Sequence, residues 1–379
     1  MRLCFVGNPG SIHTQRWVGH FAQAGHETHL VNLGPQPAYK FDWPGPQHHN
    51  LPSPLTLPFP GLRGVIMLMA RRRALAALLE QIRPDVLHAH SVADPGWFAA
   101  LSGFHPFVLT AWGSDVLLGL HQGPRLPRWL TRNALRRADL LTADARSVLD
   151  AARPHLGPGT RTALIRFGVD TRAFSPGIDA TWRARLDLEA GPVLLSIRQC
   201  HPLYNIDAII RAFARVREEL PAARLLIKLV SQTTHDPYLA EMRELAGQLA
   251  LGDAVAYVPQ VAYAEIPDLY RVADLVLSVP SSDALPVSVL EAMACGVPVI
   301  ASDLPALREL IDDGADLTLV PARDVDALSR AVLSLLTDPT RRAQVIENNL
   351  ATVRRTGDFA VEMARMEDLY LSLAGRIRT

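Results

Sequence analysis

Two carboxylates eight residues apart form the strongest chemical signal in the sequence. Asp283 follows an apolar run at 275–279, and Glu291 lies in a helical pattern that begins near Pro286 and ends at Gly296. Loop N–H groups and the helix dipole between the two carboxylates can hold a diphosphate, and each carboxylate can accept hydrogen bonds from sugar or ribose hydroxyls. The simpler alternative is that Asp283 caps the helix and Glu291 lies on its surface.

A second loop that could approach an anion follows the first predicted strand. Residues 7–13 read Gly-Asn-Pro-Gly-Ser-Ile-His, and they include Gly10 and Ser11 just before a helical pattern. The spacing fits neither the GxGxxG of dinucleotide-binding folds nor a P-loop, and no acidic residue ends the second predicted strand at 27–32. These departures argue against a nicotinamide-dependent dehydrogenase. A plain strand–helix turn remains the alternative.

The composition is that of a globular protein. The chain has 379 residues, of which 49% are hydrophobic and 20% charged, enough for two or three domains of roughly 100–200 residues. Its three cysteines are widely spaced and odd in number, which argues against a disulfide scaffold and a structural zinc site. Residues 1–7 read as a strand rather than a secretory signal, and no apolar stretch approaches the ~20 residues of a membrane span. We therefore expect an intracellular protein.

The net charge of zero hides a division between the two halves of the chain. Residues 1–175 carry 18 Lys and Arg against 10 Asp and Glu, whereas residues 176–379 carry 20 against 28. The resulting +8 and −8 suggest two domains with different partners. A basic half could face nucleic acid, anionic lipid or a phosphorylated substrate, or it could be solvated surface. We set nucleic acid aside, because the basic residues are spread out without a recognition motif.

Short apolar runs alternate with amphipathic helical patterns along the whole chain. In the first half the predicted strands are 2–7, 27–32, 85–90, 106–111, 139–143 and 162–167, with helices at 13–24, 66–82, 128–138 and 145–153. In the second half the predicted strands are 193–198, 224–230, 254–258, 275–279, 298–301 and 317–320, with helices at 206–219, 237–250, 264–272, 287–295 and 324–336. Such series predict an α/β chain of two doubly wound, Rossmann-like domains whose parallel sheets are covered on both faces.

The predicted domain boundaries are 1–175, 176–358 and, for a last helical segment, 359–379, with the join within 172–191. Ligands of open parallel sheets bind beyond the carboxyl ends of the strands. We therefore expect the two domains to face one another across a cleft that contains the chemistry.

Several segments, taken in order, resemble the retaining glycosyltransferases of family 4, which have the GT-B fold. The Asp283 and Glu291 pair resembles the D/E-x7-E signature of that family. Further matches run nearly the whole chain: the opening loop with His13 and Arg16, residues 85–90, 109–115 and 166–170, Phe174, residues 196–198 and 291–303, and Glu309. The order and spacing of these segments carry the resemblance, since each alone is a weak signal.

The resemblance implies a nucleotide-sugar donor on the C-terminal domain, with UDP favoured by frequency alone. Glu291 is then expected to hold the ribose, Asp283 to contact the transferred sugar and Arg198 to neutralise the leaving diphosphate. The other expected donor contacts are Gly10 and Ser11 of the N-terminal domain, the segment Ala284, Leu285, Pro286, Val287 and Ser288, and Gln260 and Val261 near the base. No metal and no cofactor is implied.

The resemblance also implies an acceptor on the N-terminal domain, which could be a glycan, a lipid-linked molecule or a small molecule. Asp115 and His13 are expected among the catalytic residues, and Trp112, His88 and Arg16 on the acceptor side. His88 has an alternative role as a buried, hydrogen-bonded strand residue. The final helix usually crosses back onto the first domain in this fold.

Three positions depart from the family pattern. Asp283 replaces the usual Glu, Tyr204 stands near the place of a Lys that often follows the Arg, and Trp112 takes the place of a His. Two other functions therefore stay open. One is a nucleotide-sugar epimerase, which would convert the donor without an acceptor. The other is a nucleotide-sugar-binding protein that lacks catalysis.

Basic and apolar residues gather in two stretches of the N-terminal half. Residues 51–73 contain Leu55, Leu57, Phe59, Ile66, Met67, Leu68 and Met69 together with Arg63, Arg71, Arg72 and Arg73. Arg125, Arg128 and Arg132 share one side of a predicted helix. We expect peripheral, salt-sensitive association with an anionic lipid surface at the inner face of the plasma membrane. The alternative for 51–73 is a core helix with a solvated end.

Overall fold

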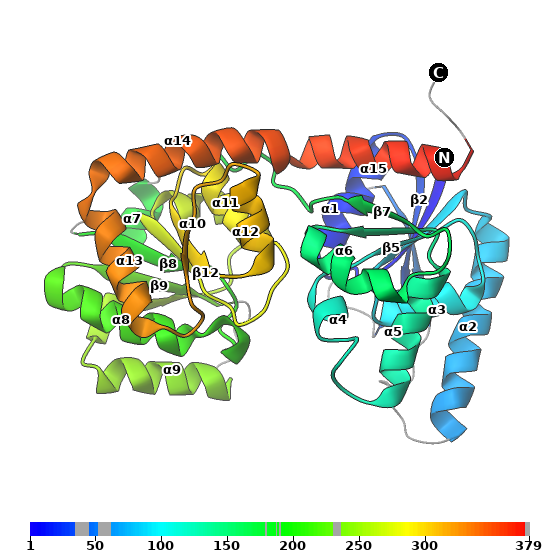
Figure 1. Cartoon of the computed structure of the whole chain (residues 1–379), viewed down its shortest axis with the longest axis horizontal. Coiled ribbons are helices and arrows are strands. Elements are labelled where there is room, and N and C mark those ends of the chain that lie inside the picture. The colour runs from blue at the N-terminus through cyan, green and yellow to red at the C-terminus, as the bar shows by residue number, and fades with distance from the viewer. Residues whose placement is uncertain are drawn as a thin grey trace. The chain divides into compact units, whose positions relative to one another are not determined.

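The computed structural model of the chain describes residues 1–34, 45–51, 62–178, 180–186, 188, 191–229 and 236–375. These residues form two compact units (Figure 1). Unit 1 comprises Met1–Phe167 and Val361–Thr379, and unit 2 comprises Gly168–Ala360. Each unit is built on one parallel sheet, so the predicted fold class of two doubly wound α/β domains is confirmed.

The sheet of unit 1 has seven parallel strands in the order β3-β2-β1-β4-β5-β6-β7. Their bounds are β1 Arg2–Val6, β2 Glu27–Asn32, β3 Gln47–Asn50, β4 Val86–His90, β5 Phe107–Thr110, β6 Leu140–Ala143 and β7 Arg161–Leu164. The strand order reverses at β1, which lies between β2 and β4. The loop that contains Gly10 and Ser11 therefore leaves the sheet at its topological switch point, where ligands of such sheets bind.

The helices of unit 1 pack on this sheet through apolar stripes. Their bounds are α1 Ile12–Gln23, α2 Leu62–Ile82, α3 Asp94–Ser102, α4 Ser114–Leu117, α5 Arg125–Arg137, α6 Arg146–Ala152, the 3-10 turn η1 Arg153–His155, and α15 Phe359–Leu373. Helix α1 buries Trp17, Val18 and Phe21 on one face, with Phe21 stacked on Phe5 of β1. None of the helices in the described ranges combines the length and apolar character needed to cross a bilayer.

Helix α15 is fastened to unit 1 by buried polar contacts. The Tyr370 hydroxyl lies 2.5 Å from Nδ1 of His88 on β4, and the Arg166 N–H donates to the Glu362 carboxylate at 3.0 Å. Tyr370 and Glu362 are both buried. Since buried polar groups without partners are costly, these bonds hold the last helix in one register on the sheet.

The sheet of unit 2 has six parallel strands in the order β10-β9-β8-β11-β12-β13. Their bounds are β8 Val193–Ser196, β9 Arg224–Lys228, β10 Val255–Val258, β11 Leu275–Ser278, β12 Val299–Ser302 and β13 Thr318–Val320. The order reverses between β8 and β11, so the loops that follow these two strands leave the sheet side by side. Those loops contain Arg198 and Asp283.

The helices of unit 2 cover both faces of its sheet. Their bounds are α7 Ala180–Arg185, η2 Pro202–Tyr204, α8 Ile206–Glu219, α9 Pro237–Gln248, η3 Gly252–Ala254, η4 Tyr263–Glu265, α10 Ile266–Arg271, α11 Val287–Ala294, α12 Pro305–Asp312, α13 Val325–Thr337 and α14 Pro339–Thr356. Right-handed crossovers place α8 and α9 on one face and α11 and α12 on the other, because the strand order runs in opposite directions from β8 and from β11.

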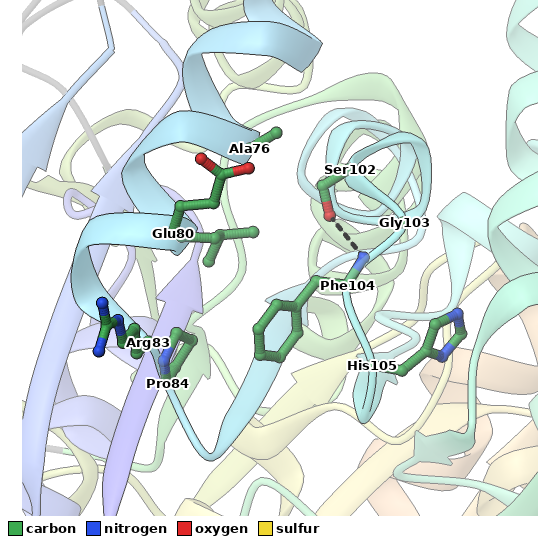
Figure 2. Close-up of a pocket in the computed structure, with 9 residues that line it drawn as sticks. Ala76, Glu80, Arg83, Pro84, Ser102, Gly103, Phe104 and His105 are labelled. Carbon is green, nitrogen blue, oxygen red and sulfur yellow. Dashed lines mark hydrogen bonds between the residues drawn. The ribbon is translucent and has the colours of Figure 1, made fainter.

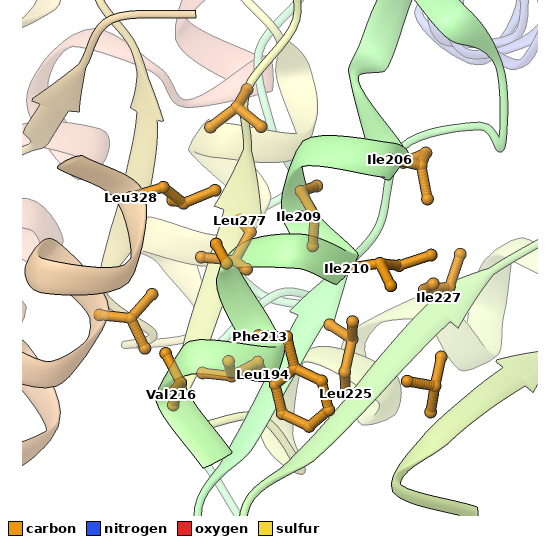
Figure 3. Close-up of a cluster of buried hydrophobic side chains, with 14 of the residues drawn as sticks. Leu194, Ile206, Ile209, Ile210, Phe213, Val216, Leu225, Ile227, Leu277 and Leu328 are labelled. Carbon is orange, nitrogen blue, oxygen red and sulfur yellow. The ribbon is translucent and has the colours of Figure 1, made fainter. Parts of the chain in front are cut away.

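A hydrophobic cluster under α8 forms the core on one face of this sheet (Figure 3). Ile209, Phe213 and Val216 repeat at helical spacing and meet Leu225 and Ile227 of β9. Burying a side chain of this size stabilises the fold by about 1.5–3 kcal/mol. The cluster fixes which residues of β9 point away from α8.

A backbone pairing joins the two ends of unit 2. Unit 2 already begins at Gly168, because Val169 pairs with Asp358: the Val169 N–H donates to the Gly357 carbonyl at 2.8 Å, and the Phe359 N–H donates to the Val169 carbonyl at 3.0 Å. Unit 2 ends at Ala360, two residues beyond this pairing. These backbone bonds join distant segments, so local composition gave no sign of them.

Candidate active site

Arg198 and Asp283 form an ion pair at the carboxyl edge of the unit 2 sheet. Nη2 of Arg198 lies 2.6 Å from Oδ2 of Asp283, and Nη1 donates to the Ser288 hydroxyl at 3.2 Å. Both charged side chains are about four-fifths buried, with 17% and 20% exposed. Burial raises the pKa of the Asp283 carboxyl, and the Arg198 charge offsets part of that rise. The pair thus holds a desolvated cation and anion beside the start of α11.

Tyr204 contributes to the same arrangement, although the sequence marked it only as a departure from the family pattern. The Arg198 guanidinium lies 4.5 Å from the centroid of the Tyr204 ring. Tyr204 ends the short turn η2, and the next residue, Asn205, is buried with its amide bound to the Val279 carbonyl and the Ser281 hydroxyl. Asn205 therefore fixes the Tyr204 segment against the loop that leads to Asp283.

Glu291 lies inside unit 2 rather than on the surface of α11. Its side chain is 8% exposed and accepts hydrogen bonds from the Tyr270 hydroxyl at 2.9 Å and the Tyr263 hydroxyl at 3.4 Å. Burial raises the pKa of Tyr270 well above its ordinary value, and the Glu291 charge adds to that effect. The two tyrosines are functional candidates that sequence reasoning missed, because only the fold brings α10 and η4 to α11.

The segment between the two carboxylates turns directly into α11. The Ala284 N–H donates to Oδ1 of Asp283 at 3.0 Å, which makes a tight turn, and Pro286 is the residue before the first turn of the helix. Ala284, Leu285 and Pro286 are buried, whereas Val287 and Ser288 are partly exposed. Gly296 ends this stretch with φ +74°, a conformation that favours glycine. The alternative had Asp283 capping the helix and Glu291 on its surface. It does not fit, because Pro286 is the residue before α11 and Glu291 is buried.

Gln260 and Val261 follow β10 at the same edge of the sheet. Gln260 is exposed and Val261 is partly buried. Between β10 and β8 lies β9, which ends in Lys228. Lys228 was not among the predicted site residues, because its position beside this site follows from strand order and not from any local motif.

In unit 1, the loop at the switch point is shaped by Asn8. The Asn8 side chain accepts from the Gly10 N–H at 2.8 Å, and its carbonyl accepts from the Ser11 N–H at 3.0 Å. Gly10 is exposed, and Ser11 is the residue before α1. The loop is thus a compact turn that leads into a helix of 12 residues.

Two aromatic rings lie against His13 near the start of α1. His13 lies 4.7 Å from Phe167 and 5.6 Å from Trp112, measured between ring centroids, and Trp112 lies 5.6 Å from Phe167. His13 and Trp112 are both partly exposed. The structure thus brings two of the predicted residues together, with a third ring that sequence reasoning did not place there. Arg16 lies one turn further along α1 and is half-buried.

Asp115 binds neighbouring loops with both carboxylate oxygens. Oδ2 accepts from the Val92 N–H at 2.8 Å and from the Ser91 hydroxyl at 3.0 Å, and Oδ1 accepts from the Trp112 N–H at 2.9 Å. Burial raises the pKa of Asp115, while these hydrogen bonds lower it. Asp115 therefore orients the loops after β4 and β5, including the one that carries Trp112.

His88 is a buried, hydrogen-bonded residue of strand β4, which matches the alternative role predicted for it. Its ring is 1% exposed, with Nδ1 bound to the Tyr370 hydroxyl and Nε2 2.6 Å from the Thr110 hydroxyl. Burial lowers the pKa of His88 well below its ordinary value. Both ring nitrogens are engaged inside the unit, which favours the structural role, and the acceptor contact of His88 stays a prediction.

A separate hollow of about 740 Å³ lies at the opposite edge of the unit 1 sheet (Figure 2). It is lined by residues before β4 and β5 and by the ends of α2 and α3, among them Glu80, Arg83, Phe104 and His105. None of the predicted site residues lines it. We assign the chemistry to the carboxyl edges instead, because that is where the motifs and the buried ionic groups occur.

Two family models match the chain. Residues 2–145 match the model described as glycosyl transferase 4-like, and residues 179–351 match the model described as glycosyl transferases group 1.

Two curated relatives illustrate the sequence similarity. A GDP-mannose-dependent alpha-(1-6)-phosphatidylinositol monomannoside mannosyltransferase of Mycolicibacterium smegmatis is 32% identical over 228 residues, which is 56% of this chain and 58% of that protein. A D-inositol 3-phosphate glycosyltransferase of Streptosporangium roseum is 27% identical over 311 residues, which is 78% of this chain and 71% of that protein. The chain thus spans little more than half the length of the first relative.

Solved structures share the arrangement of the whole chain. Sucrose-phosphate synthase of Thermosynechococcus elongatus aligns with a TM-score of 0.84 at 21% identity over 99% of both chains. Anabaena HepE in complex with UDP and glucose aligns with a TM-score of 0.79 at 18% identity over 98% of this chain and 100% of that one. The fold is therefore GT-B. With both halves matched by glycosyltransferase models, the chain belongs to the group 1, family 4-like glycosyltransferases.

Proposed function

We propose that the protein is a retaining glycosyltransferase that moves a hexosyl unit from a nucleotide-sugar to a glycan, lipid-linked or small-molecule acceptor. The observation that carries the proposal is the buried pair of Arg198 and Asp283 beside α11, with Glu291 buried on that helix. A transferase of this kind needs a fixed cation for the leaving diphosphate and carboxylates for sugar hydroxyls, and unit 2 holds both at one sheet edge.

In the proposed donor complex, Glu291 accepts hydrogen bonds from the ribose, and Asp283 accepts them from the transferred sugar. Tyr270 and Tyr263 orient the Glu291 carboxylate through their hydroxyls. The backbone of 284–288 would approach the phosphates. We favour a UDP-sugar, and support comes from HepE, whose structures are described as complexes with UDP and with UDP-glucose.

The proposed reaction is a front-face substitution. The acceptor oxygen bonds to the anomeric carbon as the bond from that carbon to the diphosphate oxygen breaks, and the departing phosphate oxygen takes the acceptor's proton. Arg198 and the N–H groups at the start of α11 stabilise the negative charge that grows on the leaving group. No metal or cofactor has a role in this scheme.

The test is product analysis by NMR after incubation of the protein with UDP-, GDP- and ADP-sugars, chosen first by the shift that each produces in Tm. A product that keeps the anomeric configuration of the donor is expected, and an inverted linkage would overturn the mechanism. Conversion of the donor without an acceptor would instead indicate an epimerase. Nucleotide binding without turnover on a broad acceptor panel would indicate a binding protein.

We further propose that unit 1 associates with an anionic membrane surface from the cytoplasmic side. Support comes from α5, where Leu126 and Trp129 are exposed at 44% and 55% although both are large and apolar. Beside Trp129 lies a hollow of about 470 Å³ lined also by Arg132, Arg136 and His155. Cations around exposed apolar side chains are typical of helices that lie at a lipid interface.

Only part of the predicted membrane stretch 51–73 belongs to the described residues. Leu55, Leu57 and Phe59 lie outside the described residues. Arg71 is 8% exposed, with its guanidinium 5.3 Å from the Phe98 ring centroid, so it packs inside unit 1. Ile66 on α2 remains exposed at 58%.

Vesicle co-sedimentation tests the membrane proposal. Binding to vesicles that contain phosphatidylglycerol is expected at low salt and should weaken as salt is added. Trp129→Ala and Arg136→Gln should reduce it, whereas Arg330→Gln on α13 of unit 2, also an exposed arginine, should leave it unchanged. Wild-type protein that stays in the supernatant at low salt would make a soluble acceptor the better proposal.

A further inference from the structure

Lys228 ends β9 between the two strands whose loops carry Arg198 and Gln260. In the sheet, β9 pairs with β8 on one side and with β10 on the other. Ile227 is opposite Ser196, and Lys228 is opposite Val258. Because all three strands are parallel, their carboxyl ends lie at one edge. Lys228 is therefore placed between the loop of the leaving-group cation and the loop expected near the base.

The side chain of Lys228 points to the face of the sheet that carries Glu291. Figure 3 shows Leu225 and Ile227 among the apolar side chains under α8. Successive side chains of a strand point to opposite faces, so Lys228 points away from α8. The crossovers place α11 on that other face. In agreement, burial lowers the pKa of the Lys228 amine, and the nearby Glu291 charge raises it in part.

The Lys228 amine has no ion-pair or hydrogen-bond partner among the residues that the structure describes. It is nonetheless partly buried, a costly environment for an ammonium group unless an anion compensates. At the same site, the Tyr204 ring lies against Arg198. Tyr204 thus occupies the place at which a second cation could bind a diphosphate. The Glu291 charge offsets only part of the cost of burying the Lys228 amine, and no described residue makes an ion-pair contact with it. A partly desolvated cation of this kind, next to a site short of one cation, points to an anionic ligand.

We propose that Lys228 binds the phosphate attached to the ribose of the nucleotide-sugar donor, while Arg198 binds the phosphate attached to the sugar. This inference rests on the proposed function. Position supports the division. Lys228 ends β9 on the face of the sheet that carries Glu291, the proposed ribose contact, and the Glu291 charge acts on it. Arg198 pairs with Asp283, the proposed sugar contact. The second cation of the diphosphate site thus comes from β9 and not from the turn after β8.

The test is isothermal titration of wild-type protein, Lys228→Met and Lys228→Arg with UDP, UMP and uridine, or with the guanosine or adenosine series if UDP does not bind. Loss of one charge-assisted contact should weaken binding of UDP and of UMP by about 10- to 100-fold. Uridine binding should be unchanged, because uridine has no phosphate. Lys228→Arg should recover part of the loss. Arg330→Met is the matched control, since it removes one positive charge of unit 2 from an exposed position on α13.

The outcomes separate this inference from the proposed function. Wild-type affinity for UDP and UMP in Lys228→Met would overturn the role of Lys228 and leave the proposed function standing. An equal loss of affinity for uridine would show that Lys228 maintains the shape of the site and does not bind a phosphate. If wild-type protein bound none of the nucleoside diphosphates, both the proposed function and this inference would fall.

Discussion

The Arg198 guanidinium stacks on the Tyr204 ring at 4.5 Å while its Nη2 atom pairs with Asp283 at 2.6 Å. The cation is thus held from two directions, by a ring face and by a carboxylate. A guanidinium fixed in this way loses little conformational freedom when a diphosphate binds. Tyr204, which departs from the family pattern, therefore orients the charge that the reaction needs.

This arrangement predicts that the ring of Tyr204 matters more than its hydroxyl. Tyr204→Ala should lower kcat/KM about 3- to 30-fold, as expected for loss of a cation–π contact of ~0.5–2 kcal/mol. Tyr204→Phe keeps the ring and should retain wild-type kinetics. Steady-state assays on both variants with the same donor provide the check. Equal losses in the two variants would show that the hydroxyl carries the effect.

The two carboxylates of the site should separate in their kinetic effects. Glu291→Ala should weaken nucleotide binding together with turnover, because ribose is present in donor and product alike. Asp283→Ala should lower kcat more than donor affinity, because sugar contacts matter most while the glycosidic bond breaks. Titration with UDP and steady-state kinetics measure the two quantities. The same loss of UDP affinity in both variants would contradict the assignment of roles.

Asp283 should also make stability depend on pH. A carboxyl whose pKa is raised by burial binds its proton more tightly in the folded than in the unfolded state, so ionising it lowers the free energy of unfolding. This cost is absent below the unfolded pKa of ~3.9 and grows as pH rises through the folded pKa.

Asp283→Asn removes that titration. The difference in Tm between this variant and wild type should therefore shift in favour of the variant as pH rises from about 4 to 7. Asp253→Asn, which removes a carboxylate at an exposed position in η3, is the control for the loss of one negative charge. A difference in Tm that does not change with pH would contradict the prediction.

The contact between His88 and Tyr370 predicts a stability effect without a binding effect. Tyr370→Phe leaves Nδ1 of His88 buried without its partner, which should lower the free energy of unfolding by about 1–3 kcal/mol. Affinity for UDP should stay at the wild-type value, since the proposed nucleotide contacts at Glu291 and Arg198 belong to unit 2.

Tyr257→Phe gives a matched comparison for this variant. It removes a hydroxyl that has no hydrogen-bond partner among the described residues, so chemical denaturation should show little change. A Tyr370→Phe protein as stable as wild type would argue that Tyr370 does not fasten α15.

The elements nearest to the site were predictable from sequence because their patterns are strong. Strands β8 and β11 are fully buried apolar runs, and α11 is bounded by Pro286 and Gly296. Strand β3, Gln47–Asn50, was missed because it is a polar and largely exposed edge strand that pairs on one side only. Helix α14 was missed because few of its residues are buried and apolar, as expected when a helix is mostly solvated.

The contacts around the site were harder to predict than its motifs. Asp283 and Glu291 share one local pattern, whereas Lys228 and Tyr270 reach them only through the order of strands and helices. The ring group of His13, Trp112 and Phe167 likewise joins three distant parts of unit 1. The sequence around these side chains shows no pattern that predicts their contacts. They can be identified only once the order of the strands and helices is known.

The discontinuity of unit 1 has a consequence for synthesis. Its core includes Met363, Met366 and Tyr370, which the ribosome makes only after the whole of unit 2. Unit 2 is one continuous stretch and can complete its own core while the ribosome is still adding α15. Unit 1 thus begins to be made before unit 2 and completes its core after it. Until then Phe5 of β1 and Phe21 of α1 lack their contact with Tyr370 of α15.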